Sequence, residues 1–366
     1  MNLKCFGSIL ILLILCFSST LLSKEDNRHY ILKNANLVKI DKIENDTITT
    51  LKGDVYLIYN DIEFFADNAQ IFQKDRKVKL FGNVRSIDDT LEAGAQKATY
   101  FHKNAILKLE KDAYFIENSS DTLLKKVTAD FIEYQKDNKK VHALNNIIAT
   151  DFIEGVVCTC GKFRYDMETD YGLARENPVL TFQRDNELKI YSKQMELFAK
   201  DKKLTATYDV KVETQDTYAT SNFLIYFNDQ EKAVMLGNPQ FKSSLSTATA
   251  EEFQVFFKDE KIHELLMVKN AVIHFKEEES IGKENYLYAE KVLMKINNDK
   301  LTYLHAQDVS RSFFEQRNGE DILINKLATL QLQVFFDEGE KIKTIIAEDD
   351  IKGTYTFSSS AQILEK

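Results

Sequence analysis

The residues in this sequence whose types and spacing could do covalent or metal chemistry are Cys158 and Cys160, which Thr159 separates. On a β strand the two thiols would project from one face, close enough for a metal or redox site. Two thiolates are only half of a zinc site, however, and no second CxxC pair or nearby HxxxH completes it. In an oxidising compartment a small disulfide between Cys158 and Cys160 is the leading interpretation, and two free thiols are the alternative.

No other set of residues indicates catalysis. The six histidines are scattered, and the 57 acidic residues follow turns and the outward positions of predicted strands, so no carboxylate pair stands out. The motifs GxSxG, HExxH and GxxxxGK(S/T) are absent. We therefore expect no catalytic residue, no metal site and no cofactor, and we keep an enzyme acting through Cys158 and Cys160 as a third hypothesis.

The charge and composition restrict the partners. The formal net charge of -9 comes from 57 acidic and 48 basic residues that are interleaved along the chain, which argues against a nucleic-acid partner. A hydrophobic content of 44% with only 2 prolines is enough for a large folded core.

The first 23 residues have the layout of a secretory signal peptide. Lys4 precedes an apolar run over residues 9–17, and the small residues at 18–20 and 23 suit cleavage. Lipidation at Cys16 is the less favoured alternative, because the residue before a lipidated cysteine should be small and here is Leu15. We predict export and removal of residues 1–23, and a soluble mature chain, because no apolar window of membrane-spanning length follows Lys24.

The elements that hold the two cysteines belong to a repeat. An Asn or Asp followed by a small or β-forming apolar residue, or by proline, recurs at steps of 29 to 42 residues. The ten positions are Asp54, Asn83, Asp112, Asn146, Asn177, Asp209, Asn238, Asn270, Asp308 and Asp350. A second, alanine-led strand precedes most of them, and a polar turn of Asn, Asp, Lys or Gly lies between the two.

This pattern predicts one β hairpin per unit, with strands that alternate apolar and polar residues. We expect about ten units, from Ile31 to Tyr355, in a single repetitive domain over residues 24–366. The segment from Gln307 to Leu330 fits least well, and we predict a longer loop after the ninth position there.

The predicted fold is all-β. Asn, Asp and Gly inside strands indicate bulges or bends, and one bend per unit would line up into a crease. The hairpins would then form an elongated antiparallel sheet, folded over into a jelly-roll-like repeat body with a lengthwise apolar groove and two unpaired edge strands.

The residues expected to line this groove are the inward-facing apolar ones of the first units. They are Val55, Leu57, Tyr59, Phe64, Ile71, Leu80, Val84, Leu91, Tyr100 and Leu107. We predict that they contact lipid, and the alternative is that they fill a dry core.

Together, the LxGxV units, the alanine-led ADxAxIF strands and Gly237-Asn238-Pro239 resemble the OstA-like, LptA-type periplasmic proteins of lipopolysaccharide transport over about residues 30–355. The resemblance implies a folded sheet (β-taco) that shields the acyl chains of lipopolysaccharide or a related glycolipid in the periplasm, without enzymatic activity. It also implies edge-to-edge joining with transport-bridge proteins of the same fold, and self-association is an option. A structural β-repeat scaffold with a dry interior is the rival hypothesis.

Overall fold

The computed structural model describes residues 30–43, 46–88, 91–119, 122–182, 188–214, 217–243, 246–258, 261–275, 284–297, 300–318, 321–337 and 342–358. The predicted signal peptide and Cys16 lie outside these residues. In the described part of the chain, no helix has the length and apolar character needed to cross a membrane.

All described strands belong to one antiparallel sheet. The first are β1 (Tyr30–Asn34), β2 (Leu37–Ile43), β3 (Asp46–Tyr59), β4 (Ile62–Phe72), β5 (Lys77–Asp88), β6 (Leu91–Phe101), β7 (Ile106–Ser119), β8 (Thr122–Gln135), β9 (Lys140–Asp151) and β10 (Val156–Asp166). The middle ones are β11 (Tyr171–Arg175), β12 (Val179–Phe182), β13 (Leu188–Tyr191), β14 (Gln194–Phe198), β15 (Lys203–Glu213), β16 (Tyr218–Phe227), β17 (Lys232–Leu236), β18 (Gln240–Lys242), β19 (Ser246–Thr249) and β20 (Glu252–Lys258). The last are β21 (Lys261–Phe275), β22 (Asn285–Asn297), β23 (Lys300–Asn318), β24 (Asp321–Phe336), β25 (Ile342–Glu348) and β26 (Lys352–Ser358).

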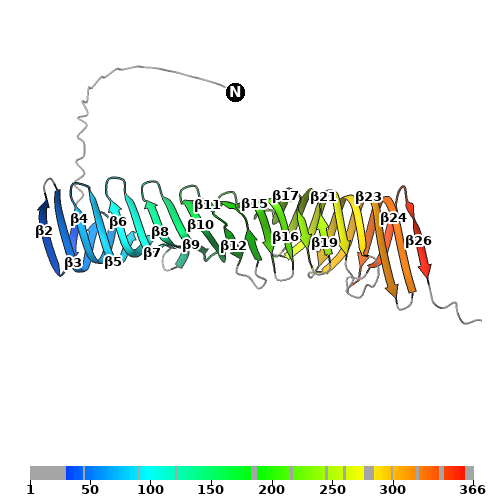
Figure 1. Ribbon diagram of the computed structural model, residues 1–366, viewed down its shortest axis with the longest axis horizontal. Coiled ribbons are helices and arrows are strands. Elements are labelled where there is room, and N and C mark those ends of the chain that lie inside the picture. Colours follow the sequence, from blue (N-terminus) through cyan, green and yellow to red (C-terminus); the bar gives the residue numbers. More distant parts are fainter. Residues whose placement is uncertain are drawn as a thin grey trace, which may run out of the picture.

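The sheet is elongated, and its strands cross the long axis in chain order from β2 at one end to β26 at the other (Figure 1). Successive strands pair antiparallel as hairpins, for example β3 with β4 and β5 with β6. The predicted all-β hairpin repeat is confirmed.

The bend in each unit lies at the predicted Asn and Asp positions. All ten have a left-handed backbone, with φ from 45° at Asn83 to 57° at Asn177. Asn and Asp tolerate this conformation better than other residues with a side chain, which explains their recurrence. The predicted crease is therefore confirmed.

The local geometry of the crease is a β-bulge. Between β3 and β4 the register shifts after Lys52 and resumes at Val55, so Gly53 and Asp54 together face Asp67 alone. Two residues opposite one bend the strand and increase its twist. The same bulge recurs on every second strand, and in places the bulged strand is divided at the bulge into two shorter strands. Bulged and plain strands therefore alternate along the body.

Prolines break two of the bulged strands at the crease. Pro178 separates β11 from β12, and Pro239 separates β17 from β18. Proline cannot donate a backbone hydrogen bond to the ladder, so pairing is interrupted there. The Pro178 and Pro239 carbonyls still accept hydrogen bonds from the Ser192 and Ala250 amides, at 3.3 Å and 3.4 Å.

The two halves of the bent strands form two layers. Hairpin turns after β3, β5, β7 and β9 lie along one edge of the folded sheet, which we call the first rim, and turns after β4, β6, β8 and β10 lie along the second rim. Side chains from opposite halves meet inside: the ring centroids of Phe64 and Tyr100 are 5.3 Å apart, and those of Phe115 and Tyr134 are 5.0 Å apart. The sheet is therefore folded over on itself.

The predicted loop after the ninth position is wrong. β23 continues to Asn318 and pairs with β24 along most of its length. Arg311 on the outer face lies 3.8 Å from the Tyr288 ring centroid, and the buried Ser312 hydroxyl donates to the Leu327 carbonyl at 3.0 Å. Arg311 and Ser312 thus have partners on neighbouring strands, which a count of polar residues does not reveal.

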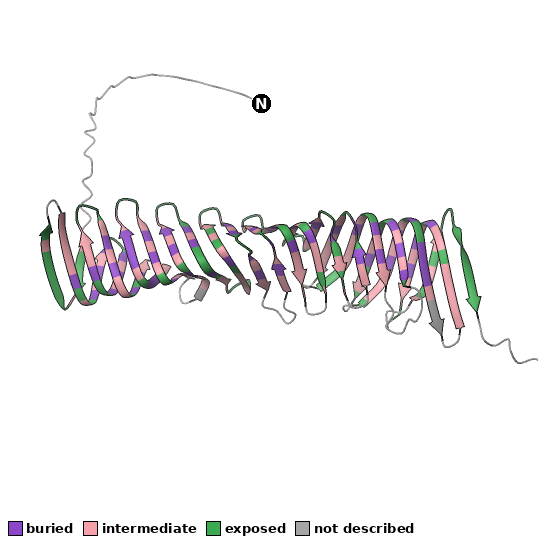
Figure 2. Cartoon of the chain, in the orientation of Figure 1, coloured by how far each residue is buried: buried purple, intermediate pink, exposed green. Residues whose placement is uncertain are grey.

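The core extends along the body. One cluster of buried apolar residues includes members from Leu51 in β3 to Val334 in β24. Buried residues accordingly recur across the strands along the long axis (Figure 2).

Candidate functional site

The structure places all ten predicted groove residues on the inner face. Eight are at most 6% exposed, and the other two, Ile71 and Leu91, are half-buried and pack against the core. They come from β3 to β7, where the alternation of each strand directs every second side chain inward. Contact of these residues with lipid stays a prediction.

The interior is filled by its own side chains over much of its length. Leu57, Phe64 and Leu80 have no exposed surface, which requires close contact on all sides. The lengthwise apolar groove that the sequence predicts is therefore closed in this structure where these residues lie, as in the alternative of a dry core.

A pocket opens beside this packed region, at the mouth between the two rims. The pocket is small: the empty space of about 340 Å³ between its lining side chains includes open solvent, and the room for the centre of a water molecule is about 20 Å³. The residues lining it are Ile62, Phe64, Ser86, Asp88, Leu91, Ala93, Tyr100, Ala105, Leu107, Phe115, Tyr134 and Lys136. Four of the predicted groove residues, Phe64, Leu91, Tyr100 and Leu107, are thus brought together around one space.

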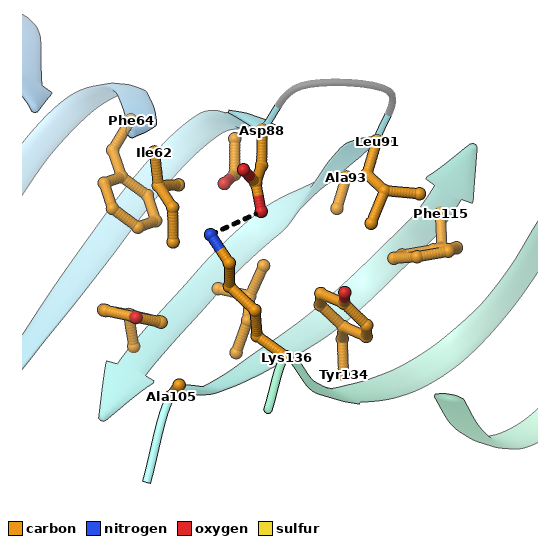
Figure 3. Close-up of a pocket in the computed structure, with 12 residues that line it drawn as sticks. Ile62, Phe64, Asp88, Leu91, Ala93, Ala105, Phe115, Tyr134 and Lys136 are labelled. Atoms are coloured by element: carbon orange, nitrogen blue, oxygen red, sulfur yellow. Dashed lines mark ion pairs between the residues drawn. The ribbon is translucent and has the colours of Figure 1, made fainter. Parts of the chain in front are cut away.

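Two charged residues stand at the mouth of this pocket. The Lys136 ammonium lies 2.8 Å from the Asp88 carboxylate. Figure 3 shows this ion pair between Ile62 and Phe64 on one side and apolar side chains that include Leu91 on the other.

Further polar contacts join the rims on both sides of the pocket. Lys125, near the first rim, donates to the Tyr165 hydroxyl at 2.8 Å, and Tyr165 donates to Asp170 at the second rim, also at 2.8 Å. Toward the beginning of the chain, the Tyr30 hydroxyl makes a hydrogen bond with the His102 ring. We call the line of these contacts the seam.

Tyr134, which lines the pocket, and Tyr165, in the seam, are held in the neutral form. Burial raises the pKa of Tyr134 to about 12, helped by the negative charge of Asp88. Burial likewise raises the pKa of Tyr165 to about 12. At neutral pH both phenols keep their protons, so Tyr165 can donate to Asp170 while it accepts from Lys125.

The apolar interior is uncovered at the two ends of the body. At the β2 end, Val38 and Ile40 pair with Leu51 and Thr49 on the inner face, yet are 49% and 65% exposed. At the other end, Tyr355 and Phe357 of β26 face inward and are 65% and 58% exposed. No further strand of the described chain covers these residues, so both ends have unpaired edges.

Cys158 and Cys160 are free thiols in the structure, and no disulfide joins them. Both face inward, as the strand spacing predicts, and both contact the core. A hydrogen bond with Cys160, together with burial, raises the pKa of the Cys158 thiol. Of the two sequence-based interpretations, the structure contains the free thiols.

The described residues contain no cluster of three or more metal-ligating side chains. Within the same residues, every fully buried side-chain nitrogen or oxygen has a hydrogen-bond partner. The arrangement can enclose apolar groups.

Sequence reasoning missed the seam. Asp88 is the last residue of β5 and Lys136 the first after β8, positions at which charged residues are usually solvated. The only signal in the sequence was their location beside turns, and many other charged residues share that location.

One family model matches part of this chain. Residues 34–171, from the end of β1 to the start of β11, match the family model described as LptA/(LptD N-terminal domain) LPS transport protein. One solved structure that the chain resembles is LptH, the LptA homologous periplasmic component of the lipopolysaccharide transport device of Pseudomonas aeruginosa. The alignment covers 28% of this chain and 75% of the LptH chain, at 12% sequence identity. The TM-score is 0.26, and we draw no argument from it. No curated protein matches the chain. The matched segment, residues 34–171, is about 38% of the chain and includes all the residues that line the pocket and the Asp88–Lys136 and Lys125–Tyr165 contacts, so in this segment the chain is similar to the LptA/(LptD N-terminal domain) family.

Proposed function

We propose that this protein is a non-enzymatic periplasmic carrier that shields the acyl chains of lipopolysaccharide or a related glycolipid inside the folded sheet. The observation that carries the proposal is the single apolar cluster that runs from β3 to β24 between two layers. Each methylene removed from water contributes about 0.8 kcal/mol, so several acyl chains can offset the separation of the layers that their binding requires.

The ends of the body support a bridge made by edge-to-edge pairing. The edge formed by β1 and β2 runs from the first rim to the second, whereas the edge formed by β25 and β26 runs the opposite way. Pairing a β26 end with a β2 end is therefore antiparallel, like the pairing of neighbouring strands within the body. It also joins the uncovered interiors of the two bodies.

Charge favours the same arrangement. The β1–β2 edge carries three lysines and one aspartate, and the β25–β26 edge, with the crease between those strands, carries three acidic residues and two lysines. Opposite net charges on the two edges favour pairing of unlike ends over like ends. The partner would be a transport-bridge protein of the same fold or a second copy of this chain.

Photo-crosslinking from inside and outside the sheet tests the carrier. We would replace Tyr100, which is buried at the pocket, with p-azidophenylalanine, and place the same group at Tyr56, which stacks on Phe65 on the outer face. We expect lipid to be found by mass spectrometry in the purified protein, and to be crosslinked from position 100 and not from position 56. Equal crosslinking from both positions, or none with no co-purified lipid, would refute the proposal.

The rival scaffold hypothesis has one observation in its favour. Side chains such as Leu57 and Leu80 are completely buried without any ligand, as in an ordinary packed core. A scaffold would purify without lipid and would give no crosslink from position 100, so the same experiment separates the two hypotheses.

A further inference from the structure

The Asp88–Lys136 ion pair joins strands that are not neighbours in the sheet. β5 pairs with β4 and β6, and β8 pairs with β7 and β9. Asp88 ends β5 at the first rim, and Lys136 follows β8 at the second rim. The pair therefore spans the mouth of the folded sheet, and it closes the mouth with side chains.

The space beneath this pair is apolar. Apart from Ser86 and the ion pair itself, carbon-rich side chains line the pocket, and Phe64 and Tyr100 form its contact with the packed interior. The aliphatic part of a lysine side chain can lie along apolar surface while its ammonium group stays in water. An acyl chain that passed the ion pair would thus meet the apolar lining of the pocket, where Phe64 and Tyr100 separate it from the packed interior.

The closure is also weak enough to open. The Lys136 and Asp88 side chains are 33% and 17% exposed, so water screens their attraction, and pairs of this kind contribute little to stability. Breaking the pair needs a side-chain rotation and no loss of a backbone ladder. The Lys125–Tyr165 and Tyr30–His102 contacts hold the seam on either side of it.

We infer that the mouth at Asp88 and Lys136 is a lateral opening, through which a single acyl chain of an amphiphile passes between the surroundings and the pocket, and that the ion pair closes it between passages. The inference rests on the proposed carrier function and adds a route to it. In a chain of bodies paired end to end, the ends are covered by partners, so a side opening supplies access that the ends do not.

A reversible lock tests the opening. The test protein is the full chain with its own cysteines replaced by alanine and with the substitutions D88C and K136C. Oxidation would join the two new cysteines in a disulfide. Uptake of the fluorescent fatty acid cis-parinaric acid would then be measured before and after the disulfide is reduced. We expect the oxidised protein to take up no probe and the reduced protein to take it up. The matched control is K97C with E110C, which replaces an ion pair of the same 2.8 Å length between neighbouring strands of one layer; its oxidation should leave uptake unchanged.

The outcomes separate the two ideas. Equal uptake by the locked and reduced proteins overturns the lateral opening and leaves the carrier standing. No uptake by the reduced protein or the unaltered chain overturns both.

Single substitutions give a second readout that does not depend on forming a disulfide. D88N removes the charge attraction with little change of shape, and we expect uptake to become about two to five times faster, the factor that corresponds to a partly exposed ion pair. E110Q is the control and should leave the rate as it is. An unchanged rate in D88N, with the protein folded by circular dichroism, overturns the inference.

Discussion

At the scale of single residues, the crease depends on side chains that tolerate a left-handed backbone and also bind across it. The Asn83 amide donates to the Asp67 carboxylate at 3.1 Å, and Asn146 donates to Asp130 in the same way at 2.9 Å. The residue before each can be glycine, as at Gly82, or carry a side chain, as at Lys111. Asn83 and Asn146 therefore contribute both a left-handed conformation and a hydrogen bond to their bends.

Substitution of Asn83 tests this role. N83A places an alanine at a φ of 45° and removes the contact with Asp67, so we expect the free energy of unfolding to fall by about 1 to 2 kcal/mol in urea denaturation. N83G loses the same hydrogen bond but keeps the conformational freedom, and should be the more stable of the two variants. Equal stability of N83A and N83G would show that backbone conformation does not matter there.

At the scale of elements, the end strands differ from the interior strands only in having one neighbour. Ile40 would be an inward core residue in any interior strand, yet it is 65% exposed in β2. Exposed strand edges with apolar side chains promote pairing with another chain. The ends are therefore the elements on which assembly depends.

The variant I40K examines the β2 edge. An inward-pointing charge on an edge strand opposes further pairing, so we expect light scattering after size-exclusion chromatography to show smaller assemblies than for the unaltered protein. I153K is the control, because Ile153 is similarly exposed, at 68%, but lies in a turn away from either end. If both variants assemble like the unaltered protein, the β2 edge is not the contact.

At the scale of the whole molecule, the body is a linear stack in which each hairpin contacts mainly its neighbours, so stability varies along it. β3 has 14 residues and β5 has 12, whereas β12 and β13 have 4 each. Fewer ladder hydrogen bonds per strand make the middle of the body the weaker part.

Hydrogen exchange followed by mass spectrometry measures this variation. We expect amides of residues 171–198 to exchange faster than those of residues 62–101, because the short strands open without disturbing long ladders. The terminal strands β2 and β26 serve as an internal reference for fraying. Uniform protection from β3 to β24 would indicate that the body unfolds as a single unit.

The sequence by itself determined the hairpins, the crease and the inward residues. These features follow from local rules. The alternation of a strand decides which face of the sheet a side chain lies on, which places Val55 inside. Only certain residues accept a positive φ, which places Asp54 at a bend. The local rule failed over residues 307–330, where partners such as Tyr288 for Arg311 lie on another strand.

Only the tertiary structure decided how far the interior is filled and where the rims meet. The contact of Asp88 with Lys136 depends on the angle at which two layers fold and on their stagger, which no single strand encodes. The same applies to the free thiols of Cys158 and Cys160, whose spacing in sequence allowed either state. Packing between distant strands depends on the summed geometry of many bends, so it becomes visible only when the whole sheet is assembled.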